Sequence, residues 1–129
     1  MVKIRVTYDG NLKCTALQES GATIQTDQEK LFSPTDLLGA ALGTCILTVM
    51  GLVAQKLKVD LSGVRATVEK EMANMPSRKL GRVVVHVFCP RILDPEVTGK
   101  LERAGIECPV HHSLHPDVQQ EVVFHWGEA

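Results

Sequence analysis

The chain has 129 residues, of which 44% are hydrophobic and 22% are charged, and its formal net charge is -1. This composition excludes a disordered chain and predicts one globular domain over residues 1–129. No block of lysines and arginines stands out, which argues against nucleic acid as a partner. Four cysteines without a secretion signal indicate a reducing compartment, so we expect a cytoplasmic protein whose thiols are available for chemistry.

The first part of the chain predicts three short antiparallel strands. Residues 2–8 alternate apolar and polar side chains, which is typical of a half-buried strand. A glycine-containing turn at 9–11 leads to a second strand at 12–18, and another turn leads to a third strand at 22–26.

A long helix is predicted from Ser33 to Lys58. Ser33 suits the N-cap, Pro34 suits the first helical position, and Asp36 places a carboxylate at the positive end of the helix dipole. Residues 37–54 carry no charge and place apolar side chains on every face, so the helix must be buried.

This uncharged run is close to the length that crosses a bilayer. Four small residues near its start, strand-like flanking segments and the lack of a Lys/Arg excess on either side favour a soluble helix instead, packed against a sheet or a second subunit. We therefore expect no membrane association.

The remaining chain predicts two strands, a helix and a last strand. Residues 64–69 alternate, 83–89 form a nearly continuous apolar strand, 94–105 have the pattern of a capped helix, and 118–126 close the chain as a strand. Together with the first part, this order predicts an α+β fold, with a mainly antiparallel six-stranded sheet and a long buried central helix.

The four cysteines are the candidates for chemistry. Cys14 and Cys89 lie in predicted strands and are expected to be small core residues. Cys45 lies about three turns into the long helix, beyond the reach of its dipole, so a thiolate there needs a cation or hydrogen-bond donors from another segment. Cys108 precedes Pro109 and is expected to cap a short helical turn near histidines, where a thiolate is stabilised. Spacing alone therefore makes Cys108 the nucleophile.

The same segment offers zinc ligands, because Cys108 and His111 have a C-x-x-H spacing and His112 and His115 follow. A second well-spaced ligand pair is missing, so we expect no metal. In the alternative interpretation His112 and His115 are exposed in a loop.

Two motifs carry a resemblance to a known family. The sequence SPTDLLGAALGTC (residues 33–45), followed much later by CPVHHSL (residues 108–114), resembles the OsmC/Ohr family of thiol-dependent peroxidases, which act on organic hydroperoxides. The resemblance covers nearly the whole chain. It implies a two-layer α+β fold and an intertwined homodimer with the long helices at its centre. It also implies that Cys45 is the peroxidatic thiol and Cys108 the resolving one, which reverses the assignment from spacing.

The implied mechanism uses no metal or organic cofactor. The Cys45 thiolate attacks a peroxide oxygen and becomes a sulfenic acid, Cys108 condenses with it to a disulfide, and a dithiol reductant restores both thiols. An apolar pocket at Leu37, Leu38 and Leu42 would favour organic hydroperoxides over hydrogen peroxide, and these leucines are expected to be core residues first.

Two positions depart from the family pattern. Thr35 stands where well-studied members carry a glutamate, and Asp36 is expected to substitute for it, as in the OsmC-like branch. The family's activating arginine comes from the segment before the long helix, but no arginine lies between Arg5 and Arg65. Arg78 is the replacement candidate, and the alternative is that it is a surface-loop residue.

A second class of function is also compatible with these residues. In this alternative the chain is a small dimeric binding protein for a hydrophobic ligand or a Cys/His-bound metal ion. It would have no peroxidase activity, and the thiols would be incidental.

Overall fold

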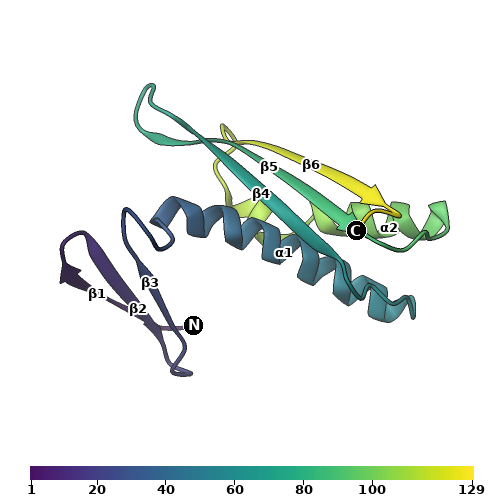
Figure 1. The fold of residues 1–129 in the computed structure, drawn as a ribbon, viewed down its shortest axis with the longest axis horizontal. Helices are drawn as coiled ribbons and strands as arrows, with labels where there is room; N and C mark the ends of the chain where they lie inside the picture. The colour runs from purple at the N-terminus through teal and green to yellow at the C-terminus, as the bar shows by residue number, and fades with distance from the viewer. The chain divides into compact units, whose positions relative to one another are not determined.

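The computed structural model describes residues 1–129 (Figure 1). Its elements in chain order are β1 (Ile4–Gly10), β2 (Lys13–Gln18), β3 (Thr23–Thr26), α1 (Pro34–Lys56), β4 (Arg65–Ala73), β5 (Lys79–Cys89), α2 (Pro95–Ile106), α3 (Pro109–Ser113) and β6 (Gln119–Trp126). This order confirms the α+β class predicted from the sequence, and α3 is the short helical turn expected after Cys108.

The six strands form two three-stranded sheets instead of one six-stranded sheet. The first sheet is the antiparallel meander β1-β2-β3, and the second has the order β4-β5-β6. β4 and β5 pair antiparallel, whereas β5 and β6 pair parallel, because α2 and α3 form the crossover that parallel neighbours require. Side-chain alternation indicates a strand but not its neighbours, so the sequence does not reveal this division.

The chain divides into two compact units, residues 1–38 and 39–129, and α1 runs across their boundary. One domain over the whole chain therefore stays a prediction. In the first unit, the strand register places Val6 opposite Ala16, and Ala16 opposite Ile24, on one face together with Ile4 and Tyr8. We call these five residues the apolar face of the first sheet. Its four large side chains are between 49% and 64% exposed, so this face is uncovered.

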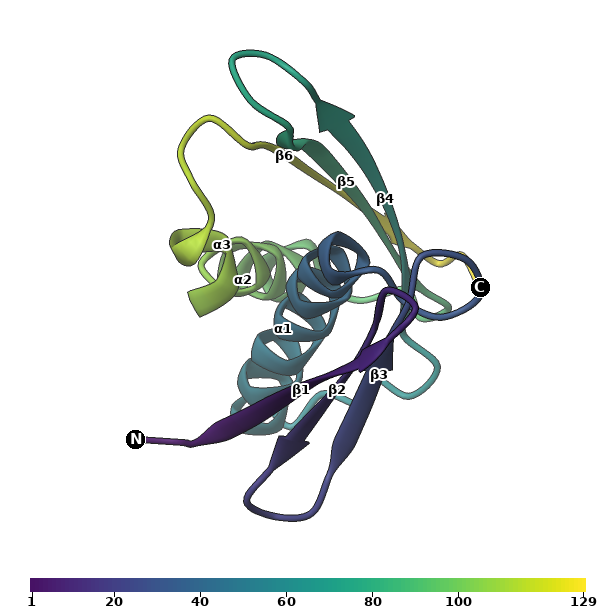
Figure 2. The same ribbon diagram turned by 90° about the vertical axis from the view of Figure 1, so that its left-hand side faces the viewer.

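The second unit holds the hydrophobic core. α1 and α2 lie on the same face of the second sheet (Figure 2). α1 contributes Leu42, Ile46 and Met50, which follow one another at four-residue spacing, and β5 contributes the alternate valines of residues 83–87. The burial of these side chains is the main source of stability in this unit.

α1 approaches β4 closely because two of its residues have no side chain. A Cβ at Gly43 would lie 2.8 Å from Cγ2 of Val68, and a Cβ at Gly39 would lie 3.3 Å from Cγ1 of the same residue. Both distances are shorter than ordinary van der Waals contact. The small residues of the helix are therefore required by its packing against the sheet.

The start of α1 is the one predicted, and its end falls two residues earlier. The backbone N–H of Asp36 donates to Oγ of Ser33 at 3.1 Å, and the backbone N–H of Ser33 donates to Oδ2 of Asp36 at 2.9 Å. This reciprocal pair is a capping box. The helix ends at Lys56, and Lys58 has a left-handed φ of 57°, which is common just after a helix.

Only one side of α1 is buried within the chain. Of its most apolar 18-residue stretch, 33% is buried, and Leu52 is 55% exposed. The burial predicted for α1 is therefore found on the side that faces the second sheet, because a sheet of three strands covers only one side of a helix. By length and composition alone α1 would also be able to cross a membrane, a property shared by core helices of soluble proteins.

Candidate active site

Cys45 and Cys108 lie together in the second unit. Cys45 is in the middle of α1, Cys108 immediately precedes α3, and Cys45 lies close enough to act on the pKa of the Cys108 thiol. Neither cysteine forms a disulfide in this structure. The fold therefore brings together two cysteines that are far apart in the sequence, as an intramolecular disulfide would require.

Cys108 is the more buried of the two thiols. It is 0% exposed, whereas Cys45 is partly exposed. Burial raises the pKa of the Cys108 thiol, the backbone N–H of His111 opposes this change, and the hydrogen bond and charge of Cys45 raise the pKa further. Cys108 is therefore a protonated thiol at neutral pH and can donate its S–H to Cys45. This environment does not favour the role of first nucleophile that spacing alone assigns to Cys108.

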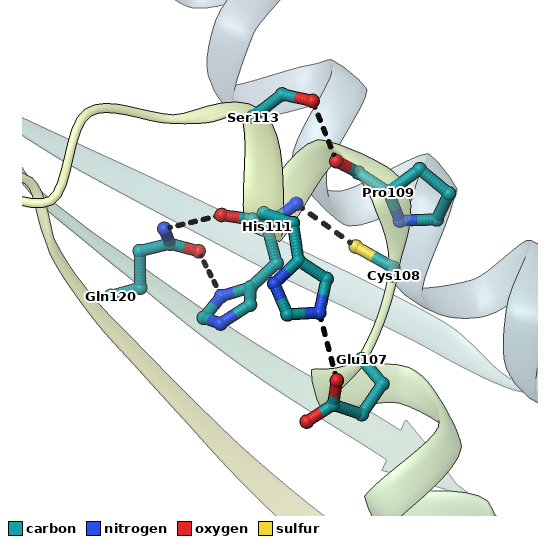
Figure 3. Close-up of polar contacts among 7 residues, drawn as sticks. Glu107, Cys108, Pro109, His111, Ser113 and Gln120 are labelled. Carbon is teal, nitrogen blue, oxygen red and sulfur yellow. Dashed lines mark hydrogen bonds and ion pairs between the residues drawn. The ribbon is translucent and has the colours of Figure 1, made fainter.

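Cys108 is held as the N-cap of α3, with Pro109 at the first helical position, as the sequence predicts. Its Sγ accepts a hydrogen bond from the backbone N–H of His111 at 3.3 Å (Figure 3). Gln120 on β6 bonds to His111 in turn, through Oε1 at 2.6 Å from Nδ1 and through Nε2, which donates to the His111 carbonyl at 3.1 Å. Sequence reasoning missed Gln120, because one glutamine in a strand carries no signal until the fold shows what it faces.

The rings of the histidines after Cys108 do not form a ligand set. His111 bonds to Gln120, and Nε2 of His112 lies 2.8 Å from a glutamate oxygen at the surface. His115 is exposed, and its Nδ1 accepts from a backbone N–H at 3.0 Å. No group of three or more histidine, cysteine, aspartate or glutamate side chains is arranged to hold a metal ion.

The other predicted site residues have local structural roles. Asp36 caps α1 through its bond with the backbone of Ser33. Arg78 lies between β4 and β5, and its guanidinium donates to Oδ1 of Asn74 at 3.4 Å. Leu42, assigned to a substrate pocket, is 0% exposed and belongs to the core. The catalytic roles of Asp36 and Arg78 stay predictions.

The fold and the thiol pair together define a class of protein. A long apolar helix in an α+β fold carries one cysteine, and a second cysteine of the same chain lies near it. Residues 27–123 match the protein family described as OsmC-like protein. The chain therefore belongs to the OsmC-like family.

Solved structures share this fold over nearly the whole chain. A protein of Psychrobacter arcticus 273-4, provisionally described as an osmotic stress induced and detoxification response protein, is 34% identical with a TM-score of 0.91, over 97% of this chain and 96% of that one. The organic hydroperoxide resistance protein OsmC of Legionella pneumophila is 18% identical with a TM-score of 0.76, over 97% and 96% of the two chains. OhrB, the organic hydroperoxide resistance protein of Bacillus subtilis, is 18% identical with a TM-score of 0.69, over 95% and 97%. A comparison with curated protein sequences gives no match.

Proposed function

We propose that this protein is a thiol-dependent peroxidase that reduces organic hydroperoxides to alcohols. The observation that carries the proposal is the contact between Cys45 and Cys108 within one chain, because a peroxidase of this kind resolves its oxidised thiol with a second one. Membership in the OsmC-like family supports it, as do structural neighbours named organic hydroperoxide resistance proteins.

Cys45 is the first nucleophile in this proposal. It is the more exposed thiol of the pair, so a hydroperoxide can reach its sulfur more easily than that of Cys108. The thiolate attacks one peroxide oxygen, the O–O bond breaks, and the alkoxide leaves and takes up a proton. The sulfur is oxidised to a sulfenic acid while the hydroperoxide is reduced to an alcohol.

Cys108 completes the turnover. Its sulfur attacks the sulfur of the Cys45 sulfenic acid, so that an S–S bond forms and the S–O bond breaks. The leaving hydroxide combines with the proton of Cys108 and departs as water. A dithiol reductant then returns both cysteines to thiols, and the proposal includes no metal or organic cofactor. Asp36 and Arg78 remain the proposed acidic and activating residues.

We also propose that the protein works as a soluble, cytoplasmic homodimer. The apolar face of the first sheet and the exposed side of α1 are surfaces that a second copy would remove from water. The exposed apolar residues of α1, such as Leu52 at 55%, support the intertwined arrangement.

The test is the consumption of cumene hydroperoxide and of hydrogen peroxide by the purified protein, with dithiothreitol as the reductant. We expect faster consumption of cumene hydroperoxide, and a Cys45–Cys108 disulfide in peptides mapped under non-reducing conditions. Cys14→Ser serves as the matched control and should keep full activity. Hydroperoxide that remains unconsumed, with all thiols retained, would overturn the proposal and favour the binding-protein alternative.

A further inference from the structure

Two side-chain hydrogen bonds connect β6 to α3 behind Cys108 (Figure 3). Gln120 Oε1 lies 2.6 Å from Nδ1 of His111, and Gln120 Nε2 lies 3.1 Å from the backbone oxygen of the same histidine. We call this pair of bonds the Gln120–His111 clamp. Both residues are partly buried, so water competes only weakly for these bonds.

The chemistry of the two bonds fixes the direction of each. A backbone carbonyl can only accept, so the Gln120 nitrogen must be the atom that faces it, and the Gln120 oxygen must face the ring. That oxygen can only accept, so Nδ1 of His111 carries the hydrogen. A residue without both an acceptor and a donor at this position cannot reproduce the clamp.

The clamp fastens a short helix to the second sheet. α3 has five residues, far fewer than the roughly 12 that an isolated helix needs to persist in water. The N–H that bonds to Sγ of Cys108 belongs to His111, the residue that the clamp holds from both ring and carbonyl. Fixing His111 to the sheet therefore fixes this N–H against the sulfur.

We propose that Gln120 and His111 are positioning residues for the resolving thiol, holding a backbone N–H on the Cys108 sulfur while it becomes the attacking thiolate. This inference rests on the proposed function. In the resolving step Cys108 gives up its proton, which leaves with the hydroxide of the Cys45 sulfenic acid as water, and negative charge builds on the Cys108 sulfur. A hydrogen bond to a charged acceptor is stronger than one to a neutral thiol, so the N–H stabilises this step selectively.

The backbone N–H of His111 is the hydrogen-bond donor to Cys108 whose position depends on the clamp. Cys45 on α1 is the titratable group that faces it, and its hydrogen bond and charge raise the pKa of Cys108. Glu107 and His112 flank the site in sequence, but they pair with each other at 2.8 Å and are exposed. The backbone N–H of His111 is the larger of the influences that lower this pKa, so loosening the clamp should raise it.

The experiment is a single turnover of the full-length protein with one equivalent of cumene hydroperoxide and no reductant. Samples quenched over time are analysed by mass spectrometry for dimedone-trapped Cys45 sulfenic acid and for the Cys45–Cys108 disulfide. Gln120→Met keeps the side-chain length and removes both bonds, and His111→Phe removes the ring bond. Gln119→Met and His112→Phe are the matched controls, because Gln119 is exposed on the opposite face of β6 and His112 pairs away from the sulfur.

We expect sulfenic acid to form in Gln120→Met at the wild-type rate and the disulfide to form about tenfold more slowly, in line with the loss of one hydrogen bond to a charged group. The pH at which disulfide formation reaches half of its maximal rate should rise in Gln120→Met and His111→Phe and stay unchanged in both controls. Equal slowing of both steps, an unchanged midpoint or a wild-type rate of disulfide formation would each overturn the inference.

Diamide separates this inference from the proposed function, because it oxidises the thiol pair without a hydroperoxide. If the wild-type protein ignores cumene hydroperoxide but closes its disulfide with diamide about tenfold faster than Gln120→Met does, the peroxidase proposal fails and the clamp stands. If Gln120→Met and the wild-type protein close at the same rate with diamide, the clamp fails.

Discussion

Substituting Gly43 by alanine tests how closely α1 packs against the second sheet. The added Cβ would lie 2.8 Å from Cγ2 of Val68, and beyond its chain neighbours and the backbone of its own helix it would approach no other atom within 4 Å. Overpacking of this kind costs about 1–3 kcal/mol, while alanine is favoured over glycine inside a helix by about 1 kcal/mol. Gly43→Ala should therefore destabilise the protein by about 0–2 kcal/mol. Gly51→Ala, on the same helix with nothing within 4 Å, should stabilise it by about 1 kcal/mol.

Urea unfolding at one fixed protein concentration measures both changes as shifts of the midpoint, provided that the slope is unchanged. The decisive comparison repeats Gly43→Ala in a Val68→Ala background. There the contact is gone, so the same substitution should become stabilising, like Gly51→Ala. If Gly43→Ala costs the same with and without the Val68 side chain, the close approach of α1 to β4 is not what excludes a Cβ at this position.

Further predictions concern the thiols, the assembly and pH. Cys45→Ser should abolish hydroperoxide consumption, whereas Cys108→Ser should allow one turnover and leave a sulfenic acid that dimedone traps; the opposite pattern would restore the assignment from spacing. Sedimentation equilibrium at micromolar concentration should show a dimer, and a monomer would refute the intertwined arrangement. Because the thiolate attacks and burial raises the pKa of Cys108, single-turnover disulfide formation should accelerate as pH rises and level off only above about pH 8.5, the ordinary thiol pKa. The Asp27 carboxylate accepts hydrogen bonds from three backbone N–H groups, and these bonds, led by that of Leu31, lower its pKa. Its contribution to stability should therefore be full above about pH 3.9 and be lost as pH falls through the lowered pKa. Acid unfolding of Asp27→Asn, compared with the parent protein, would show this effect.

Local chemistry made much of the fold predictable. Ser33 and Asp36 are close in sequence and form the capping box themselves, so the start of α1 follows from their spacing. The apolar run of β5 likewise identifies the central strand, which has neighbours on both sides. The parallel pairing of β5 with β6 was not predictable, because it depends on the path that the chain takes through α2 and α3 between the two strands.

In the site too, features that depend on neighbouring residues were predictable, and features that depend on distant residues were not. The N-cap position of Cys108 and its N–H donor follow from Pro109, and both are present. Spacing cannot show that Cys108 is buried against Cys45, and this burial outweighs the donor and raises the pKa. The resemblance to the family, not the spacing, placed Cys45 beside it. Gln120 was invisible for the same reason, since its partner lies on a different element.

In the proposed peroxidase cycle, the burial of Cys108 determines how excess oxidant would inactivate the protein. Cys108 is 0% exposed and Cys45 is partly exposed, so within this pair only the Cys45 sulfur would be open to surplus hydroperoxide. A second equivalent that arrives before the disulfide closes would carry Cys45 from sulfenic to sulfinic acid, which a dithiol does not reverse. A damaged chain would then hold one permanently oxidised sulfur beside one intact thiol. Under the proposed mechanism, the speed of disulfide closure would thus set the oxidant dose at which the protein stops working.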